Sequence, residues 1–156
     1  MLNKQQLRAV LDILKRSKNT RPILTNMVWR GEYLHATDGY VAVRFKVSDS
    51  SDKNIALSFE KLERFYKLMG TKDLLKLEEF KTNGVEEIGY PNMETLWQNV
   101  GAEGKAHHHF NPELLITALK TFNTKDVSFK PEGNIIKIKC ADVEALACGL
   151  VSKDDE

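Results

Sequence analysis

The sequence has few cysteines, no excess of one charge and no long hydrophobic run. Its 156 residues include two cysteines, Cys140 and Cys148, too few for a disulfide framework, which indicates a reducing compartment. Lys and Arg number 23 against 22 Asp and Glu, and this net charge of +1 argues against nucleic-acid binding by bulk charge but permits a local basic face. No apolar run approaches the ~20 residues of a membrane helix, and no signal peptide precedes the first helical pattern. We therefore expect a soluble cytoplasmic protein with no membrane partner.

Catalytic signatures are also missing. There is no glycine-rich phosphate loop, no Cys-x-x-Cys pair, no serine elbow and no zinc-protease helix. The triplet His107, His108 and His109 is the most tempting metal site. Neighbouring strand residues point to opposite faces, so only His107 and His109 could share an ion, and no obvious third ligand accompanies them. A strand end or surface loop is the simpler interpretation, and we expect no enzyme activity, no metal and no cofactor.

The first 47 residues predict a helix followed by a three-strand meander. Leucine and valine recur at i, i+3, i+4 and i+7 over residues 4–17, a spacing typical of an amphipathic helix. Three strand segments are predicted after it, separated by a Gly-Glu and an Asp-Gly turn, at 23–30, 33–36 and 40–47. The polar stretch 48–54 is interpreted as a connection.

The last third repeats this plan. A helix beginning at Asn111-Pro112 precedes strands predicted at 127–130, 135–140 and 143–151. Together these patterns predict an α+β fold with helices packed on antiparallel sheet. The expected single domain, 1–156, consists of a first unit at 1–47, a variable middle segment at 48–105, a second unit at 106–151 and an acidic tail at 152–156.

Basic residues gather on one flank of the first helix. Lys4, Arg8 and Lys15 project together beside the apolar stripe, although Asp12 interrupts them. Arg16, Lys18 and Arg21 continue the positive charge past the end of this flank. From composition alone a solvated face is the simpler interpretation. The alternative is a helix laid beside nucleic acid, where such residues bind phosphates in a salt-dependent way without reading sequence.

Four short segments occur in an order that matches a known family. They are Arg21-Pro22-Ile23-Leu24-Thr25-Asn26, His35-Ala36-Thr37-Asp38-Gly39-Tyr40, Tyr90-Pro91-Asn92-Met93-Glu94-Thr95-Leu96 and Phe110-Asn111-Pro112-Glu113-Leu114-Leu115. The first two resemble the strand and Ala-Thr-Asp-Gly turn of the bacterial DNA polymerase sliding clamp, the beta subunit of the replicative polymerase. The third is similar to the segment leading into the clamp's last interdomain linker, and the fourth to the final helix of its last domain.

The resemblance implies a DNA-clamp-like domain made of two helix-plus-meander units, with helices lining a DNA hole and sheets outside. It implies a non-catalytic processivity factor for DNA replication that self-assembles around duplex DNA. A full clamp chain carries three such domains and closes a six-domain ring from two chains. This chain offers about one, so a ring would need a homo-oligomer of about six copies, as in a short phage-type relative.

The resemblance also assigns two sets of site residues. The DNA-facing residues would be Lys4, Arg8, Lys15, Arg16, Lys18, Arg21, Lys120 and Lys125. A pocket for short peptides from DNA polymerase or other replication proteins would comprise Leu24, Thr37, Gly39, Tyr40, Val41, Ala42, Pro91 and Leu96, closed by Cys148 and Leu150.

Two departures from the family pattern bear on the pocket. Tyr40-Val41 replaces a more polar pair, and the acidic tail replaces an apolar ending. Ordinary core packing beneath a sheet accounts for Leu24, Val41 and Leu96 equally well. A second hypothesis is therefore a monomeric adaptor or decoy that binds replication proteins or a host clamp without encircling DNA.

Overall fold

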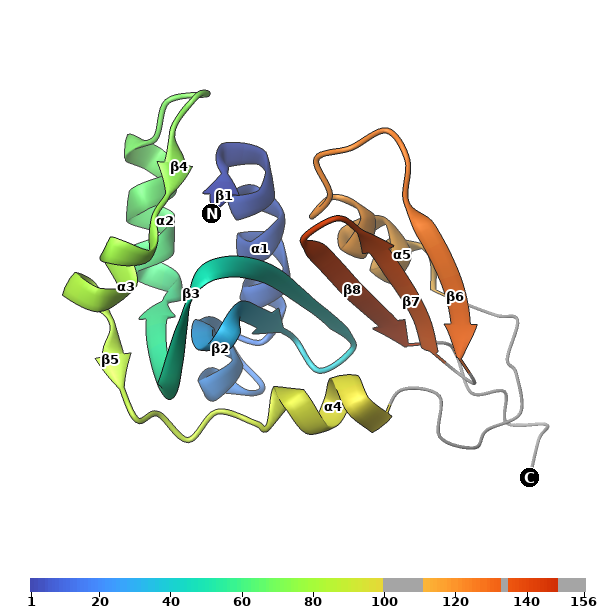
Figure 1. Cartoon of the computed structure of the whole chain (residues 1–156), viewed down its shortest axis with the longest axis horizontal. Helices are drawn as coiled ribbons and strands as arrows, with labels where there is room; N and C mark the ends of the chain where they lie inside the picture. The colour runs from blue at the N-terminus through green and yellow to red at the C-terminus, as the bar shows by residue number, and fades with distance from the viewer. Residues whose placement is uncertain (100–110, 133–134, 149–156) are drawn as a thin grey trace.

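The computed structural model describes residues 1–99, 111–132 and 135–148 (Figure 1). Along the chain the elements are β1 (Leu2–Asn3), α1 (Lys4–Arg16), β2 (Asn26–Thr37), β3 (Val41–Ser58), α2 (Phe59–Leu68), β4 (Leu74–Leu75), α3 (Leu77–Asn83), β5 (Val85–Glu86), α4 (Met93–Asn99), α5 (Pro112–Leu119), β6 (Ser128–Glu132), β7 (Ile135–Cys140) and β8 (Val143–Cys148). Among the described helices, none is long and apolar enough to cross a membrane.

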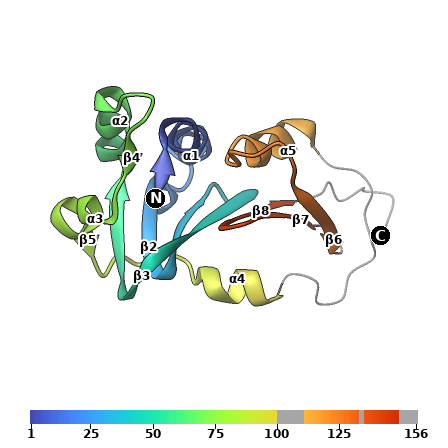
Figure 2. The ribbon, with the colours of Figure 1, turned by 45° about the horizontal axis from the view of Figure 1, so that its top comes forward.

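One antiparallel sheet contains strands from both the first and the last third of the chain. Its strand order is β2-β3-β8-β7-β6, with β5 paired to β3 off this path. The seam between the two halves is the β3–β8 pairing, which runs from Val41 opposite Ala147 to Phe45 opposite Val143. Helices α1, α2 and α5 cover one face and α4 lies on the other (Figure 2). The predicted α+β arrangement of helices on an antiparallel sheet is confirmed.

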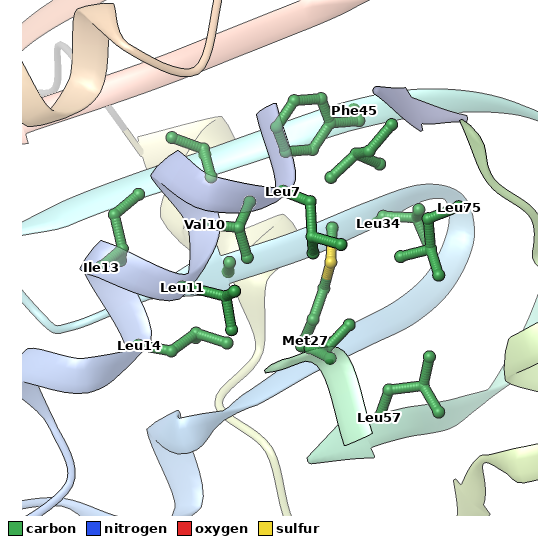
Figure 3. Packing of buried hydrophobic residues seen from close by; sticks show 14 of the residues in the cluster. Leu7, Val10, Leu11, Ile13, Leu14, Met27, Leu34, Phe45, Leu57 and Leu75 are labelled. Carbon is green, nitrogen blue, oxygen red and sulfur yellow. The ribbon is translucent and has the colours of Figure 1, made fainter. Parts of the chain in front are cut away.

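Helix α1 begins where the sequence provides a capping box. The Asn3 side chain accepts a hydrogen bond from the Gln6 amide at 2.8 Å, and the Gln6 side chain accepts one from the Asn3 amide at 3.1 Å. The helix then presents Leu7, Val10 and Leu14, all fully buried, to the sheet (Figure 3). Truncating one such leucine to alanine typically costs ~2–5 kcal/mol, so this face contributes strongly to the stability of the fold.

The first meander differs from its prediction. Residues Pro22–Thr25 form a 3-10 turn instead of starting a strand. The rest of the first predicted segment, 26–30, and the second one, 33–36, are two parts of the single strand β2. The turn predicted at Gly31-Glu32 is a sharp bend within β2. Gly31 has a φ of +57°, and the pairing register between β2 and β3 shifts on both sides of it. The bend lets both halves of β2 pair with β3.

Strand β3 also runs past the predicted boundary at 47. Its second half pairs with the first half of β2, from Ser51 opposite Gly31 to Ser58 opposite Asn26. The predicted connection 48–54 is therefore strand, because exposed polar side chains do not prevent backbone pairing. The boundary between first unit and middle segment does not coincide with a break in structure.

The second unit follows its prediction within the described residues. Helix α5 is followed by β6, β7 and β8, close to the predicted positions. The histidine triplet 107–109, Leu150 and the acidic tail 152–156 lie outside the described residues. The middle segment contains the end of β3 and then α2, β4, α3, β5 and α4. The sequence analysis did not predict α4.

Candidate functional site

A cavity of about 260 Å³ opens on the face of the sheet that carries α4, and we call it the apolar cavity. Nine of the ten predicted pocket residues line it: Leu24, Thr37, Gly39, Tyr40, Val41, Ala42, Pro91, Leu96 and Cys148. Sequence reasoning missed its other lining residues, which are Arg21, Asn92, Met93, Ile135 and Leu146. Whether the cavity binds a peptide stays a prediction.

The turn between β2 and β3 forms one rigid wall of the apolar cavity. The Asp38 Oδ1 accepts hydrogen bonds from the Tyr40 amide at 2.8 Å and the Val41 amide at 2.7 Å. The Thr37 hydroxyl donates to the Val41 carbonyl and accepts from the Gly39 amide. Gly39 has φ +92°, and a Cβ there would overlap the Arg21 guanidinium. The Thr-Asp-Gly sequence thus fixes the turn by local chemistry.

The bend in β2 brings the opposite wall into place. Leu24 lies in the 3-10 turn that precedes β2 and Thr37 is the last residue of β2, yet both line the same cavity. A straight strand of this length would separate them by more than ~30 Å, so β2 doubles back at Gly31. The Gly-Glu pair in the sequence was the signal for this bend.

Helix α4 lies over the same face of the sheet as the apolar cavity, lines it with Met93 and Leu96, and is held there by Arg44. The Arg44 guanidinium lies 4.4 Å from the ring centroids of both Tyr33 and Trp97. It also donates to the Glu144 carboxylate from Nε at 2.9 Å and from Nη2 at 2.5 Å. Burial opposes ionisation of Glu144, but the hydrogen bonds and charge of Arg44, together with Lys139 and Lys137, outweigh it and lower the pKa of Glu144. The contact between Arg44 and Trp97 holds the neighbouring residue Leu96 at the cavity wall.

The mouth and walls of the cavity differ in chemistry. Arg21 and Tyr40 lie at the edge, and the Tyr40 side chain is 61% exposed. Burial, and secondarily the charge of Asp38, raise the pKa of the Cys148 thiol, which therefore stays protonated and contributes a small apolar surface. An apolar pocket with a few polar groups at its edge suits an aliphatic or aromatic anchor of a partner.

On the helical face, basic residues surround a hollow between α1, α2 and α5. Lys4, Arg8 and Lys120 line this hollow of about 430 Å³ together with Tyr66 and one acidic residue, Asp12. The Asp12 carboxylate lies 3.5 Å from the Arg8 Nε. The Lys4 ammonium and the Arg8 guanidinium lie 5.2 Å and 5.8 Å from the Tyr66 ring centroid. Lys15 and Lys125 are exposed. This basic hollow is a local positive surface on a nearly neutral chain.

Three predicted DNA-facing residues that do not line the basic hollow, Arg16, Lys18 and Arg21, contact other parts of the chain. Arg16 donates to the Thr117 hydroxyl at 2.5 Å and lies 3.6 Å from Asp38. Lys18 lies over the Phe59 ring, and Arg21 lies at the mouth of the apolar cavity. Sequence reasoning grouped them with the basic flank because Arg16 ends α1 and the other two follow it closely, but the chain turns away from the helix after Arg16.

Comparison with solved structures identifies the fold, whereas no family model and no curated protein sequence matches the chain. DNA polymerase III subunit beta from Borrelia burgdorferi, solved in complex with a natural product, superposes with a TM-score of 0.62 at 9% identity over 97% of this chain. The chain has the fold of a bacterial DNA polymerase III beta subunit. The beta subunit of Thermotoga maritima gives 0.59 at 10% identity, and a putative one from Eubacterium rectale gives 0.52 at 10%, each over 97% of this chain.

The resemblance drawn from four short segments is thus confirmed at the level of the clamp fold. The chain spans less than two thirds of these clamp structures, 63% of the first and 64% of the other two. Within the clamp fold, the basic hollow lies on the helical face and the apolar cavity on the opposite face of the sheet.

Proposed function

We propose that this chain is a small clamp-like processivity factor that binds duplex DNA on its helical face and captures replication proteins through short peptides. The apolar cavity carries the proposal, because residues far apart in sequence converge on it from the β2–β3 turn, α4 and β8. Such a role needs no catalysis. DNA polymerase is the partner class that the clamp fold favours.

The peptide part of the proposal is supported by the shape and lining of the apolar cavity. Its volume of about 260 Å³ is enough for one or two large apolar side chains. Leu24 and Ala42 are almost fully buried at its base, so an anchor inserted there would be removed from water. Binding energy concentrated in a few buried anchors is typical of peptide capture.

The DNA part is supported by the basic hollow, which predicts weak, salt-sensitive binding without sequence preference. Three phosphate contacts, from Lys4, Arg8 and Lys120, correspond to a log–log slope of affinity against salt of about −3. Removing one cation, as in Arg8→Ala, should reduce the slope by about 1 for every duplex sequence. Anisotropy titrations of a labelled duplex at several salt concentrations measure this slope.

The matched control is Lys53→Ala, because Lys53 pairs with Glu86 at the β3–β5 edge, away from the hollow. Its slope should equal that of the wild type. A salt-independent affinity, or equal slopes for both variants, contradicts DNA binding at this hollow.

Assembly into a ring distinguishes the clamp from the adaptor. A ring of clamp-like domains requires a mass near six times 17.8 kDa, which light scattering after size exclusion measures across a dilution series. We expect this large assembly, and retention on circular but not linear DNA. A monomer at every concentration, with and without DNA, contradicts the ring.

The adaptor remains the second candidate on one observation. The chain spans less than two thirds of the clamp structures it resembles, while the apolar cavity is formed within it. A monomer that binds the peptide and not DNA would establish the adaptor.

A further inference from the structure

A second cavity lies beside the apolar cavity, and we call it the polar cavity. It has a volume of about 340 Å³ and shares a wall with the apolar cavity, formed by Pro91, Asn92 and Met93. Unlike its neighbour, it is lined mainly by polar and charged side chains. These are Arg30, His35, Asn54, Glu87, Tyr90, Asn92 and Glu94.

The base of the polar cavity contains a buried imidazole with an unused hydrogen-bonding atom. His35 is 1% exposed, and its Nδ1 has no hydrogen-bond partner within the part of the chain that the structure describes. Burial, and secondarily the charge of Arg44, lower the pKa of His35 to about 4. The ring is therefore neutral near pH 7 and can accept a hydrogen bond from a ligand.

The remaining lining is rich in acceptors. Glu87 and Glu94 are exposed carboxylates at the rim, set against the single guanidinium of Arg30. The Asn54 amide nitrogen already donates to the Ile88 carbonyl at 3.2 Å, so the side chain offers its oxygen. Two carboxylates, an amide oxygen and a neutral ring nitrogen favour a positively charged donor over an anion.

We propose that the polar cavity receives a guanidinium group, carried by an arginine of the same peptide whose apolar anchor fills the apolar cavity. The proposal rests on the proposed peptide binding. A guanidinium has several donors in one plane, so it can reach a carboxylate at the rim and the imidazole at the base together. The shared wall at Pro91–Met93 places the two cavities within reach of one short peptide.

The test compares two synthetic peptides that share an adjacent leucine and phenylalanine and differ only in a flanking arginine or citrulline. Citrulline keeps the shape of arginine and removes its charge. The arginine peptide should bind about 10-fold more tightly, as expected for a hydrogen-bonded charge. Glu94→Gln and Glu87→Gln should reduce this ratio towards one, whereas Glu60→Gln, on the exposed first turn of α2, should leave it unchanged.

The outcomes separate this inference from the proposed function. Equal affinity of the two peptides for the wild type overturns the guanidinium site while peptide capture stands. If neither peptide binds, peptide capture fails, and titration with agmatine then decides the site. Agmatine shifts of the His35 ring signals in NMR, lost in Glu94→Gln, would support a site for a free guanidinium compound. No shift would overturn it.

Discussion

Replacing Leu96 by aspartate should weaken binding of a leucine–phenylalanine peptide by about 100-fold, because the new carboxylate would face the buried anchor of the peptide. Leu96 lines the apolar cavity from α4 and is 38% exposed, so the free protein should tolerate the change. Fluorescence anisotropy of the labelled peptide measures the loss. Tyr40 lies at the mouth of the cavity and is 61% exposed, so Tyr40→Asp should weaken peptide binding less than Leu96→Asp does.

The matched control for this change is Leu68→Asp. Leu68 is 75% exposed at the end of α2, on the helical side of the sheet, so it adds the same charge away from the apolar cavity. Peptide affinity should stay at the wild-type value, and thermal unfolding should show that both variants fold. Wild-type affinity in folded Leu96→Asp would show that the peptide does not use this cavity.

The family resemblance led to the apolar cavity because one of the segments that carry the resemblance, the Thr37-Asp38-Gly39 turn, also forms a wall of the cavity. The Thr37-Asp38-Gly39 turn is held by hydrogen bonds within a few residues, so the sequence that encodes it also encodes its shape. The amphipathic spacing of α1 was likewise sufficient to identify its buried face.

Tertiary contacts account for what sequence reasoning missed. Strand β3 continues past 47 because the bend at Gly31 offers it a second stretch of β2 to pair with. Helix α4 is held by the Arg44 guanidinium between two rings from distant segments, a contact with no signature in local spacing. Arg21 and Arg16 look like part of a basic flank in sequence, yet the structure places them against the cavity mouth and Asp38.

His35 should make the folded state sensitive to mild acid. Its folded pKa of about 4 lies below the ordinary value of 6.5, so between these values the unfolded chain binds a proton that the folded chain does not. The free energy of unfolding should therefore fall as pH decreases from 6.5 to 4, by about 3 kcal/mol in total at ~1.4 kcal/mol per pKa unit. Above pH 6.5 both the folded and the unfolded chain have a neutral His35, so His35 causes no loss of stability there.

Urea unfolding from pH 7.5 to 4 in wild type and His35→Gln isolates this effect. Glutamine keeps a hydrogen-bonding side chain without a titrating group, so the variant should lose much less stability across the window, whatever its stability at neutral pH. Asp49 and Glu144 have pKa values below their ordinary range, so their contributions are lost at lower pH than that of His35. Parallel pH curves for the two proteins would mean that His35 is not buried as a neutral ring. The base of the polar cavity would then be positively charged in mild acid and unsuited to a guanidinium.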